Sequence, residues 1–415
     1  MEKICVIGLG YIGLPTACIL AKSGYDILGV DVNDDVIKLL NSGNIHIEEE
    51  GLKELFKKVV DEKRIKVSKN IEKSDVFIIA VPTPLNKENK ADLSYVIEAA
   101  KMIKDYIQKG NLVILESTSP PGTARNIIGN IIDKDTGLKS GKDYYLSYCP
   151  ERVMPGKIVY ELVNNDRIIG GINRKSAEKA KEVYEKFVEG KIYLTTLEVA
   201  ELVKLAENTY RDVSIAFSNE LSLICSDYGV NVWDVIKFAN IHPRVNILNP
   251  GPGVGGHCIP IDPWFMLENI NRKYTLIEKS RNINNSIPFV ISNKILEIIK
   301  EYKSPKVTFF GLSYKENVGD IRESPAVAIY NELIKKEINV SIFDPLIKNT
   351  KYKIASLEDS LINSDLLLLL TAHKNFNNVS LGHVSRLMRN KNIFDTRNFF
   401  NKEEAIKYGF KYYTV

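Results

Sequence analysis

The Gly-Leu-Gly-Tyr-Ile-Gly stretch at residues 8–13 constrains the fold of this 415-residue chain more than any other feature. An apolar strand pattern at residues 3–8 runs into it and a helical pattern follows, which is the context of a dinucleotide-binding βαβ unit. In such a turn the first glycine permits the tight bend, the second lets the backbone approach a pyrophosphate, and the third lets helix and strand pack closely. The helix N-terminus also favours phosphate groups. The predicted cofactor residues of this turn are Gly8, Gly10, Tyr11, Ile12 and Gly13.

Asp31 predicts which dinucleotide this turn binds. It lies 21 positions beyond Gly10 (31 − 10), at the end of a second apolar run over residues 25–31. A carboxylate at that place accepts hydrogen bonds from the ribose hydroxyls and repels a 2′-phosphate, so NAD is favoured over NADP. The alternative is a glycine-rich strand–helix turn that binds no ligand.

Short apolar runs alternate with helical patterns in the first half of the chain and again after residue 304, which indicates parallel sheets covered on both faces. The expected strands lie at residues 3–8, 25–31, 65–67, 75–81, 112–116, 144–148, 167–169, 306–310, 340–343, 366–371, 392–395 and 411–415. Between the two sets, helical periodicity runs unbroken over residues 198–228. The predicted fold class is α/β, with two Rossmann-like doubly wound domains (1–195 and 304–415) joined by a helical central domain (196–303) that contains a long connecting helix.

The second doubly wound domain is not expected to bind a dinucleotide in the same way. Gly311, Ser313 and Glu316 stand where the first domain has its three glycines. The backbone of this turn therefore cannot cradle a pyrophosphate as the first one does, and we expect it to hold a different nucleotide.

Composition excludes several classes of protein. A net charge of +4 with scattered basic residues gives no footprint for nucleic acid, and no apolar run approaches the ~18 residues needed to span a bilayer. A strand pattern that begins by Lys3 argues against a secretory leader. The five cysteines are widely spread and show no metal-binding spacing, so we expect a cytoplasmic protein without a metal site.

Cys258 is the cysteine most suited to chemistry. It directly follows a loop that contains four glycines, and Asp262 comes four residues later. A flexible polar loop is a poor place to bury a small apolar side chain, whereas Cys5 and Cys18 fit the apolar core. A nucleophilic cysteine needs access and a nearby cation or helix N-terminus, and Lys204 could supply the cation.

Two further groups of polar residues are candidates for the same site. Thr83 and Thr118 follow expected strands, at the edge of the sheet where a cofactor binds, so they could line the nicotinamide. Glu201, Lys204, Asn208 and Arg211 recur at spacings of three and four on the long helix and therefore share one face. The alternative for this second group is a solvated polar stripe.

Several motifs, in order along the whole chain, resemble the UDP-glucose/GDP-mannose dehydrogenase family. These motifs are GLGYIGLP, VPTP, EST–PPGT, CPER at 149–152, KLAENTYR at 204–211, GGHC–D at 255–262 and YK–D–RESPA at 314–326. Within the family, the HPRVNI segment at 242–247 is most similar to members that act on UDP-N-acetyl-D-mannosamine. UDP-glucose-specific members usually carry an aromatic residue in place of His257 and a second glutamate near Pro155, so Glu151 is the glutamate we assign.

The resemblance implies a four-electron oxidation that converts a sugar CH2OH to a carboxylate with two NAD and one water, as a step toward polysaccharide or glycan precursors. Cys258 would hold the intermediate as a thiohemiacetal and then a thioester, and a homodimer or higher homo-oligomer is expected. The implied catalytic residues are Cys258, Lys204, Asn208, Asp262, Thr118 and Glu151. Arg322 is implied to lie near the cofactor. The implied substrate-binding residues are Glu151, Arg152, Lys204, Asn208, Arg211, Arg244 (reaching a neighbouring subunit's substrate), Asn246, Gly255, His257, Tyr314, Lys315 and Arg397.

Three alternatives stay open at this point. The same chemistry could act on UDP-N-acetylglucosamine or another UDP-hexose. A two-electron hydroxyacid-type dehydrogenase would share the first domain but would use lysine without a cysteine. A non-catalytic sensor of nucleotide sugars would form no NADH, so the number of NADH formed per substrate separates the three classes.

Overall fold

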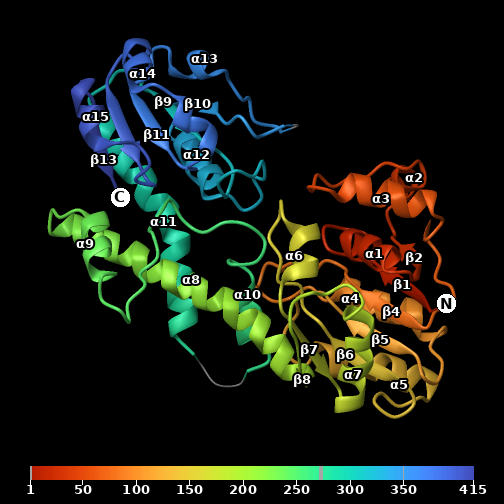
Figure 1. Cartoon of the computed structure of the whole chain (residues 1–415). Helices are drawn as coiled ribbons and strands as arrows, with labels where there is room; N and C mark the ends of the chain where they lie inside the picture. Colours follow the sequence, from red (N-terminus) through yellow and green to blue (C-terminus); the bar gives the residue numbers. More distant parts are fainter. Residues whose placement is uncertain (1, 271–273, 349) are drawn as a thin grey trace. The chain divides into compact units, whose positions relative to one another are not determined.

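A computed structural model describes all residues except 1, 271–273 and 349 (Figure 1). The chain divides into two compact units, the first comprising Met1–Glu207 with Trp264–Asn271 and the second comprising Asn208–Pro263 with Arg272–Val415. Each unit is built on its own mainly parallel sheet, and the segment between the two sheets in the sequence is helical. The predicted fold class is confirmed.

The sheet of the first unit has eight strands in the order β3-β2-β1-β4-β5-β6-β7-β8. All neighbours are parallel except β6 and β7, which pair antiparallel. The strands are β1 (Lys3–Ile7), β2 (Asp26–Val30), β3 (Ile65–Ser68), β4 (Val76–Ile79), β5 (Leu112–Leu115), β6 (Tyr145–Tyr148), β7 (Arg167–Gly171) and β8 (Ile192–Thr196). The helices are α1 (Gly13–Lys22), α2 (Asp34–Asn41), α3 (Leu52–Asp61), α4 (Ser94–Lys104), the π-helix η1 (Ala124–Gly129), α5 (Asn130–Thr136), α6 (Ile158–Asn164) and α7 (Arg174–Tyr184).

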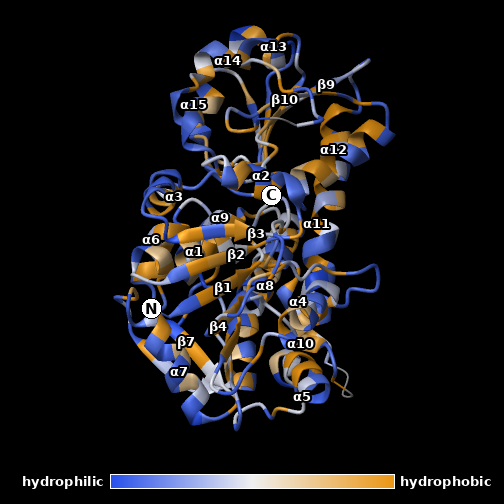
Figure 2. Ribbon diagram, turned by 90° about the vertical axis from the view of Figure 1, so that its right-hand side faces the viewer, coloured by the Kyte–Doolittle hydropathy of each residue, from blue (hydrophilic) through white to orange (hydrophobic). Residues whose placement is uncertain are grey.

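Helices cover both faces of this sheet, which explains why its central strands are apolar without alternation. Every residue of β4 and β5 is buried, and Figure 2 shows the hydrophobic residues gathered along the strands. One face packs on α1, α3 and α7 and the other on α4 and η1. β8 was not predicted, because its side chains are all half-buried or exposed and it lacks the apolar run of an inner strand.

The sheet of the second unit has five parallel strands in the order β10-β9-β11-β12-β13. They are β9 (Lys306–Phe310), β10 (Asn339–Phe343), β11 (Leu366–Leu369), β12 (Asn392–Asp395) and β13 (Lys411–Thr414). The remaining helices are α9 (Val232–Ala239), α10 (Asp262–Leu267), α11 (Leu276–Ile299), α12 (Pro325–Lys335), α13 (Leu357–Leu361), η2 (Lys374–Asn378), α14 (Leu381–Leu387) and α15 (Lys402–Lys407). This order repeats that of β2-β1-β4-β5-β6 in the first unit.

The long helix α8 (Leu197–Asp227) has 31 residues, which confirms the helix expected over 198–228. It belongs to the first unit up to Glu207 and to the second from Asn208. Within the second unit it packs on α11 through a buried ion pair between Arg281 and Asp212, whose side chains are 2% and 0% exposed. Among the described helices, none combines the length and apolar character needed to cross a membrane.

Candidate functional site

The glycine turn between β1 and α1 has the geometry of a phosphate-binding loop. A Cβ at Gly8 would lie 2.6 Å from the Ala80 carbonyl oxygen, and one at Gly13 would lie 1.8 Å from the Gly8 carbonyl oxygen. These two glycines are therefore required by the packing of the turn itself. A Cβ at Gly10 would meet nothing within 4 Å, so its absence leaves room for a ligand to approach the backbone.

The first turn of α1 is open to an anion. Ile12 stands at the N-cap and provides no side-chain hydrogen bond, and the first turn carries no acidic residue. Tyr11 beside it is 44% exposed. By contrast, Asn33 caps α2 with its side chain. The Leu14 N–H donates to the Gly10 carbonyl oxygen at 3.1 Å, but no side chain caps the start of α1, which fits the pyrophosphate of NAD.

Asp31 follows β2 and faces this turn. Its Oδ2 accepts a hydrogen bond from the Leu9 N–H at 2.9 Å, and its Oδ1 accepts one from the Asn33 N–H at 2.9 Å. These bonds fix the carboxylate beside the glycine turn while each oxygen keeps a further lone pair for a ribose hydroxyl. The residues of this region therefore fit an NAD molecule.

The loops after β4 and β5 are joined to each other at the same edge of the sheet. The Thr83 hydroxyl donates to the Thr118 carbonyl oxygen at 2.6 Å, and the Ser117 hydroxyl donates to the Val81 carbonyl oxygen at 2.7 Å. Because the carbonyl of Ala80 also lies against Gly8, both loops border the glycine turn. The two threonines are therefore placed beside the cofactor region of the first unit.

The polar face of α8 is largely buried rather than solvated. Glu201 accepts hydrogen bonds from the Gly122 and Ala124 N–H groups at 2.6 and 3.0 Å, so it anchors the loop that carries Thr118. Burial raises the pKa of Glu201 to about 7. Lys204 and Asn208 are each only 9% exposed and lie one helical turn apart.

Cys258 lies with Asp262 and Asn208 in the second unit. The Asn208 Nδ2 donates to the Asp262 Oδ2 at 2.6 Å, and the Asp262 N–H donates to the Cys258 carbonyl oxygen at 2.9 Å. Of the five cysteines, all within the described ranges, Cys258 is the exposed one, and the other four are buried. The structure thus joins the amide of Asn208 on α8 to the carboxylate of Asp262, and joins Asp262 through the backbone to the exposed Cys258.

The CPER segment after β6 is tied into the first unit by two ion pairs. The Arg167 Nη1 donates to Glu151 Oε1 at 2.7 Å, and these side chains are 5% and 8% exposed. Arg152 forms a bidentate ion pair with Glu207 of α8. Its Nε donates to Oε2 at 3.0 Å and its Nη2 donates to Oε1 at 2.5 Å. The ion pair with Glu207 therefore holds the Arg152 side chain against α8.

A pocket of about 330 Å³ in the second unit is lined by five of the twelve predicted substrate residues. Cationic side chains from three parts of the chain line it, and the tip of the Cys258 loop forms one wall. The predicted residues among its lining are Arg211, Gly255, Tyr314, Lys315 and Arg397. Such a group of cations around a small polar cavity suits a diphosphate.

Arg397 is fixed deep in this pocket. Its Nε donates to the Leu370 carbonyl oxygen at 3.0 Å, and burial lowers its pKa to about 10, so it stays charged at neutral pH. Trp233, which the sequence did not single out, also lines the pocket. Its Nε1 donates to the Thr414 hydroxyl at 2.9 Å, which orients the indole.

The loop that precedes Cys258 packs on the segment after β9. A Cβ at Gly255 would lie 2.5 Å from the Glu323 carbonyl oxygen, so only glycine fits there. His257 Nε2 lies 3.4 Å from Asp320 Oδ2, and the same carboxylate accepts from Arg322 at 2.7 Å. Burial raises the pKa of Asp320, but hydrogen bonds from His257 and Arg322 outweigh it and hold the pKa well below its usual range. Arg322 is thereby paired with Asp320, the aspartate of the YK–D–RESPA motif.

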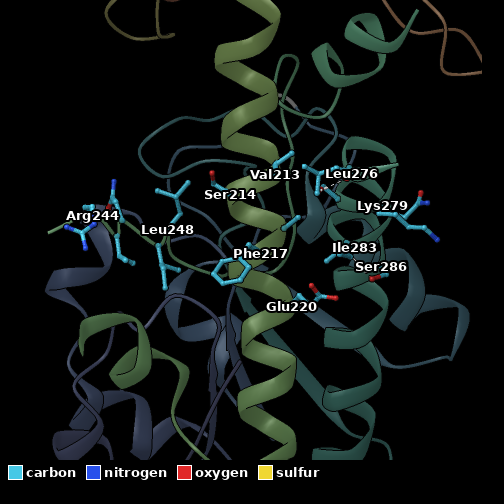
Figure 3. Close-up of a pocket in the computed structure, with 16 residues that line it drawn as sticks. Val213, Ser214, Phe217, Glu220, Arg244, Leu248, Leu276, Lys279, Ile283 and Ser286 are labelled. Carbon is cyan, nitrogen blue, oxygen red and sulfur yellow. Dashed lines mark hydrogen bonds between the residues drawn. The ribbon is translucent and has the colours of Figure 1, made fainter. Parts of the chain in front are cut away.

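Arg244 and Asn246 do not line the diphosphate-sized pocket. They border a separate groove of about 1010 Å³ against α8 and α11 in the same unit. Figure 3 shows Arg244 and Leu248 on one side of α8, Ile283 on the other, and Phe217 on α8 between them.

The second glycine turn explains why this unit is not a second dinucleotide site. Asp344 occupies the place that Asp31 has in the first unit, but its Oδ2 already accepts from the Leu312 N–H and the Ser313 hydroxyl, at 2.8 and 3.0 Å. His373 Nε2 lies a further 3.1 Å from the same oxygen, and both side chains are fully buried. No capacity remains on that oxygen for a ribose hydroxyl.

Comparison with known proteins matches the whole length of the chain to one group of enzymes. Residues 2–188, 198–286 and 308–402 match the NAD-binding, central and UDP-binding domains of the UDP-glucose/GDP-mannose dehydrogenase family. The UDP-N-acetyl-D-mannosamine dehydrogenase of Methanococcus vannielii is 50% identical over 99% of this chain and 96% of its own. Two solved structures of such enzymes, from Staphylococcus aureus and Pyrococcus horikoshii, are 45% and 40% identical, each with a TM-score of 0.92. Each covers all of this chain, and the match spans 98% and 99% of their own chains.

Proposed function

Because this chain belongs to the UDP-glucose/GDP-mannose dehydrogenase family, we propose that it oxidises UDP-N-acetyl-D-mannosamine to UDP-N-acetyl-D-mannosaminuronate. The reaction uses two NAD and one water and turns the C6 hydroxymethyl group into a carboxylate. The observation that carries this function is the Cys258–Asp262–Asn208 cluster, in one unit with a cationic pocket of diphosphate size.

The cofactor is held by the first unit. The backbone of residues 8–13 receives the pyrophosphate and Asp31 receives the adenosine ribose, while Thr83 and Thr118 border the nicotinamide. A bound NAD supplies a hydride acceptor for the substrate carbon, once for each of the two oxidations. The negative charge of Asp31 excludes the 2′-phosphate of NADP.

Cys258 retains the substrate between the two oxidations. Its sulfur adds to the C6 aldehyde that the first oxidation leaves, which gives a thiohemiacetal, and the second oxidation converts this adduct to a thioester. Water then attacks the thioester carbonyl carbon, the carbon–sulfur bond breaks, and the thiol is regenerated with the carboxylate product. Sulfur suits this role because a thiolate is a strong nucleophile near neutral pH.

Five further residues are assigned to charge stabilisation and to the attacking water. Asn208 and Lys204, one turn apart on α8, donate to the alkoxide or oxyanion that develops at C6. Asp262 fixes the Asn208 amide by accepting its hydrogen bond at 2.6 Å. Asp262, Thr118 and Glu151 are assigned to the water that hydrolyses the thioester.

The UDP moiety occupies the pocket of the second unit. Arg397 and Lys315 pair with the diphosphate, with Arg211 at the pocket edge and Tyr314 and Gly255 beside the sugar. Arg322 lies near the cofactor, and His257 and Arg152 stay assigned to the sugar end of the substrate. The three domains expected from the sequence, with boundaries at 195/196 and 303/304, are proposed because they correspond to the three domains of the family.

The active enzyme is a homodimer formed through α8. Tyr210, Phe217 and Ile224 recur every seven residues on this helix and are 68%, 54% and 47% exposed, so they form an apolar stripe. Arg244 and Asn246 border the groove beside this stripe rather than their own pocket. A second subunit covers the stripe and receives Arg244 in its substrate site. The cytoplasm is the compartment proposed for this enzyme, because a reducing environment keeps the Cys258 thiol free.

Counting NADH per molecule of UDP-sugar consumed tests this function. Two NADH per UDP-N-acetyl-D-mannosamine are expected, and one NADH would instead indicate a two-electron dehydrogenase. In a substrate panel, UDP-N-acetyl-D-mannosamine should give the highest kcat/KM and UDP-glucose almost none. Discrimination of ~10²-fold or more is feasible, because a misplaced acetamido group leaves buried polar groups unpaired. Equal or faster turnover of UDP-N-acetylglucosamine would contradict the substrate assignment alone.

A further inference from the structure

Two carboxylates and one guanidinium are enclosed together beneath the carboxyl edge of the first sheet. Glu116 follows β5, Glu151 follows β6, Arg167 belongs to β7 and Tyr184 ends α7, and none of the four is more than 8% exposed. Arg167 Nη1 donates to Glu151 Oε1 at 2.7 Å, and the Tyr184 hydroxyl donates to Glu116 Oε1 at 2.6 Å. Glu151 is therefore bound to the cation, and Glu116 to a neutral phenol.

The printed hydrogen bonds of Arg167, made by Nη1 and Nη2, go to groups other than Glu116. Nη1 also lies 3.5 Å from the Cys149 sulfur, and Nη2 donates to the Leu162 carbonyl oxygen at 3.3 Å. The flat face of the guanidinium lies 4.6 Å from the centre of the Tyr184 ring. Within the described residues, the hydrogen bonds of Arg167 thus serve Glu151 and not Glu116.

The charges around Glu116 do not balance if both carboxylates are ionised. The titratable and charged groups that face it are Glu151, Cys149, Arg167 and Tyr184, and α1 adds only the Thr16 hydroxyl. A single cation cannot compensate two buried anions, and an uncompensated buried anion is strongly disfavoured. The Thr16 hydroxyl lies beside Glu116 and lowers its pKa, but burial and the negative charge of Glu151 raise that pKa by more.

We propose that Glu116 is a positioning residue for Glu151: it remains protonated, so that Arg167 serves Glu151 alone and holds that carboxylate fixed in orientation. The inference rests on the proposed function, in which Glu151 assists the attack of water on the thioester. Burial, together with the negative charge of Glu151, raises the pKa of Glu116 to about 8. Above that pH, Glu116 ionises, competes for Arg167 and weakens the hold on Glu151.

The test compares kcat of the wild type and of Glu116→Gln from pH 6.5 to 9.5. Glutamine keeps the shape of the protonated acid but cannot ionise, so the ratio of variant to wild-type kcat should rise by about 3- to 10-fold between pH 7 and pH 9. Glu178→Gln is the matched control, because Glu178 lies on the exposed face of α7 in a pair with Arg174. Its ratio to the wild type should stay constant with pH. A constant ratio for Glu116→Gln would overturn the proposal.

A second measurement detects the proton on the Glu116 carboxyl group directly and does not depend on enzyme activity. Infrared difference spectra at pH 7 between the wild type and Glu116→Gln should show a protonated carboxyl band that only the wild type has, and its absence would overturn the proposal. The band should disappear as the pH rises through about 8.

Glu151→Gln separates this inference from the proposed function. It should lower kcat by about 10- to 100-fold if Glu151 assists hydrolysis. Full activity of Glu151→Gln would show that Glu151 has no role in the reaction. A positioning role of Glu116 toward Glu151 would then serve no purpose. A loss of activity in Glu151→Gln together with a constant Glu116→Gln ratio would overturn the role of Glu116 alone.

Discussion

Cys258 differs from the other cysteines in its access to solvent, and that difference decides which thiol can react. Burial raises the pKa of Cys5, Cys18 and Cys149 to about 12, so these thiols stay protonated at neutral pH. Cys258 is exposed on the loop before α10, and its carbonyl oxygen accepts hydrogen bonds from the N–H groups of Ile261 and Asp262 at 3.0 and 2.9 Å. The backbone around the sulfur is therefore fixed while the sulfur itself stays accessible.

Replacing Cys258 with serine should abolish turnover and leave binding largely intact. A hydroxyl is a far poorer nucleophile than a thiolate at neutral pH, whereas the glycine turn and the cationic pocket are unchanged. Calorimetric titration should give NAD and UDP-sugar affinities close to those of the wild type. Rapid-quench mass spectrometry of the wild type should find a substrate adduct on the Cys258 peptide, and an adduct on Cys149 would refute the assignment.

Replacing Asp31 with asparagine should weaken NAD binding by roughly 10- to 100-fold, since hydrogen bonds to a charged group contribute about 1.5–3 kcal/mol. The variant keeps an oxygen for the Leu9 N–H and loses the charge that repels a 2′-phosphate, so the preference for NAD over NADP should narrow. Fluorescence titration with both cofactors measures this. Asp34→Asn, in an exposed pair with Lys69, is the control. An unchanged preference in Asp31→Asn would contradict the role given to its charge.

At the scale of elements, buried polar contacts connect α11 and α8 to the loop that carries Cys258. Asn284 of α11 donates to the Asp212 carboxylate at 2.8 Å and accepts from Asn219 at 2.9 Å, and Asn219 accepts from the Gly251 N–H at 3.0 Å. Arg281 completes this series by pairing with Asp212. The position of the glycine-rich loop therefore depends on two helices distant from it in sequence.

Replacing Arg281 with methionine should lower the free energy of unfolding by about 3–5 kcal/mol, because Asp212 would be left as an uncompensated buried charge. Adding Asp212→Asn to that variant should recover much of the loss. Arg174→Met breaks an exposed pair with Glu178 and should cost less than about 1 kcal/mol. Urea unfolding compares the variants, and equal costs at the two sites would contradict the importance of the buried pair.

The elements that the sequence predicts well are those with a strong local pattern. The apolar runs of β1, β4 and β5 and the unbroken periodicity of α8 are local signals, whereas the half-exposed β8 has none. Cys258 and Asp262 are four residues apart, so their proximity could be expected. The pairing of Glu116 with Tyr184, of Arg152 with Glu207 and of Trp233 with Thr414 joins positions 55 to 181 residues apart, and no local pattern encodes it.

Arg244 borders the groove beside α8 and does not line the diphosphate-sized pocket. We therefore predict that an inactive Arg244 variant and an inactive Cys258 variant restore activity when they are mixed. Arg244→Ala and Cys258→Ser should each be nearly inactive as pure dimers. If Arg244 acts in its partner's site, a mixed dimer has one complete site, formed by Cys258 of one subunit and Arg244 of the other. Random reassembly should then recover about a quarter of wild-type activity.

The control for this experiment blocks the interface. Phe217→Glu places a charge in the apolar stripe of α8 and should shift the protein to monomers in analytical ultracentrifugation, with recovery lost. Tyr160→Glu, at a 67% exposed position on α6, should leave the dimer intact. Absence of recovery from dimers that demonstrably exchange subunits would show that Arg244 acts within its own subunit.

The five-stranded sheet repeats the order of five strands of the first sheet, but the aspartates that follow β2 and β10, Asp31 and Asp344, differ in their hydrogen-bond partners. Each carboxylate oxygen of Asp31 keeps capacity for a ribose, whereas the Oδ2 of Asp344 is occupied by its own turn and by His373. The Oδ2 of Asp344 offers no free lone pair to an adenosine ribose, so accumulated NADH should compete with NAD and leave the UDP-sugar site untouched. NADH and UDP should therefore inhibit independently of each other. Added NAD should relieve only the inhibition by NADH, and added UDP-sugar should relieve only the inhibition by UDP.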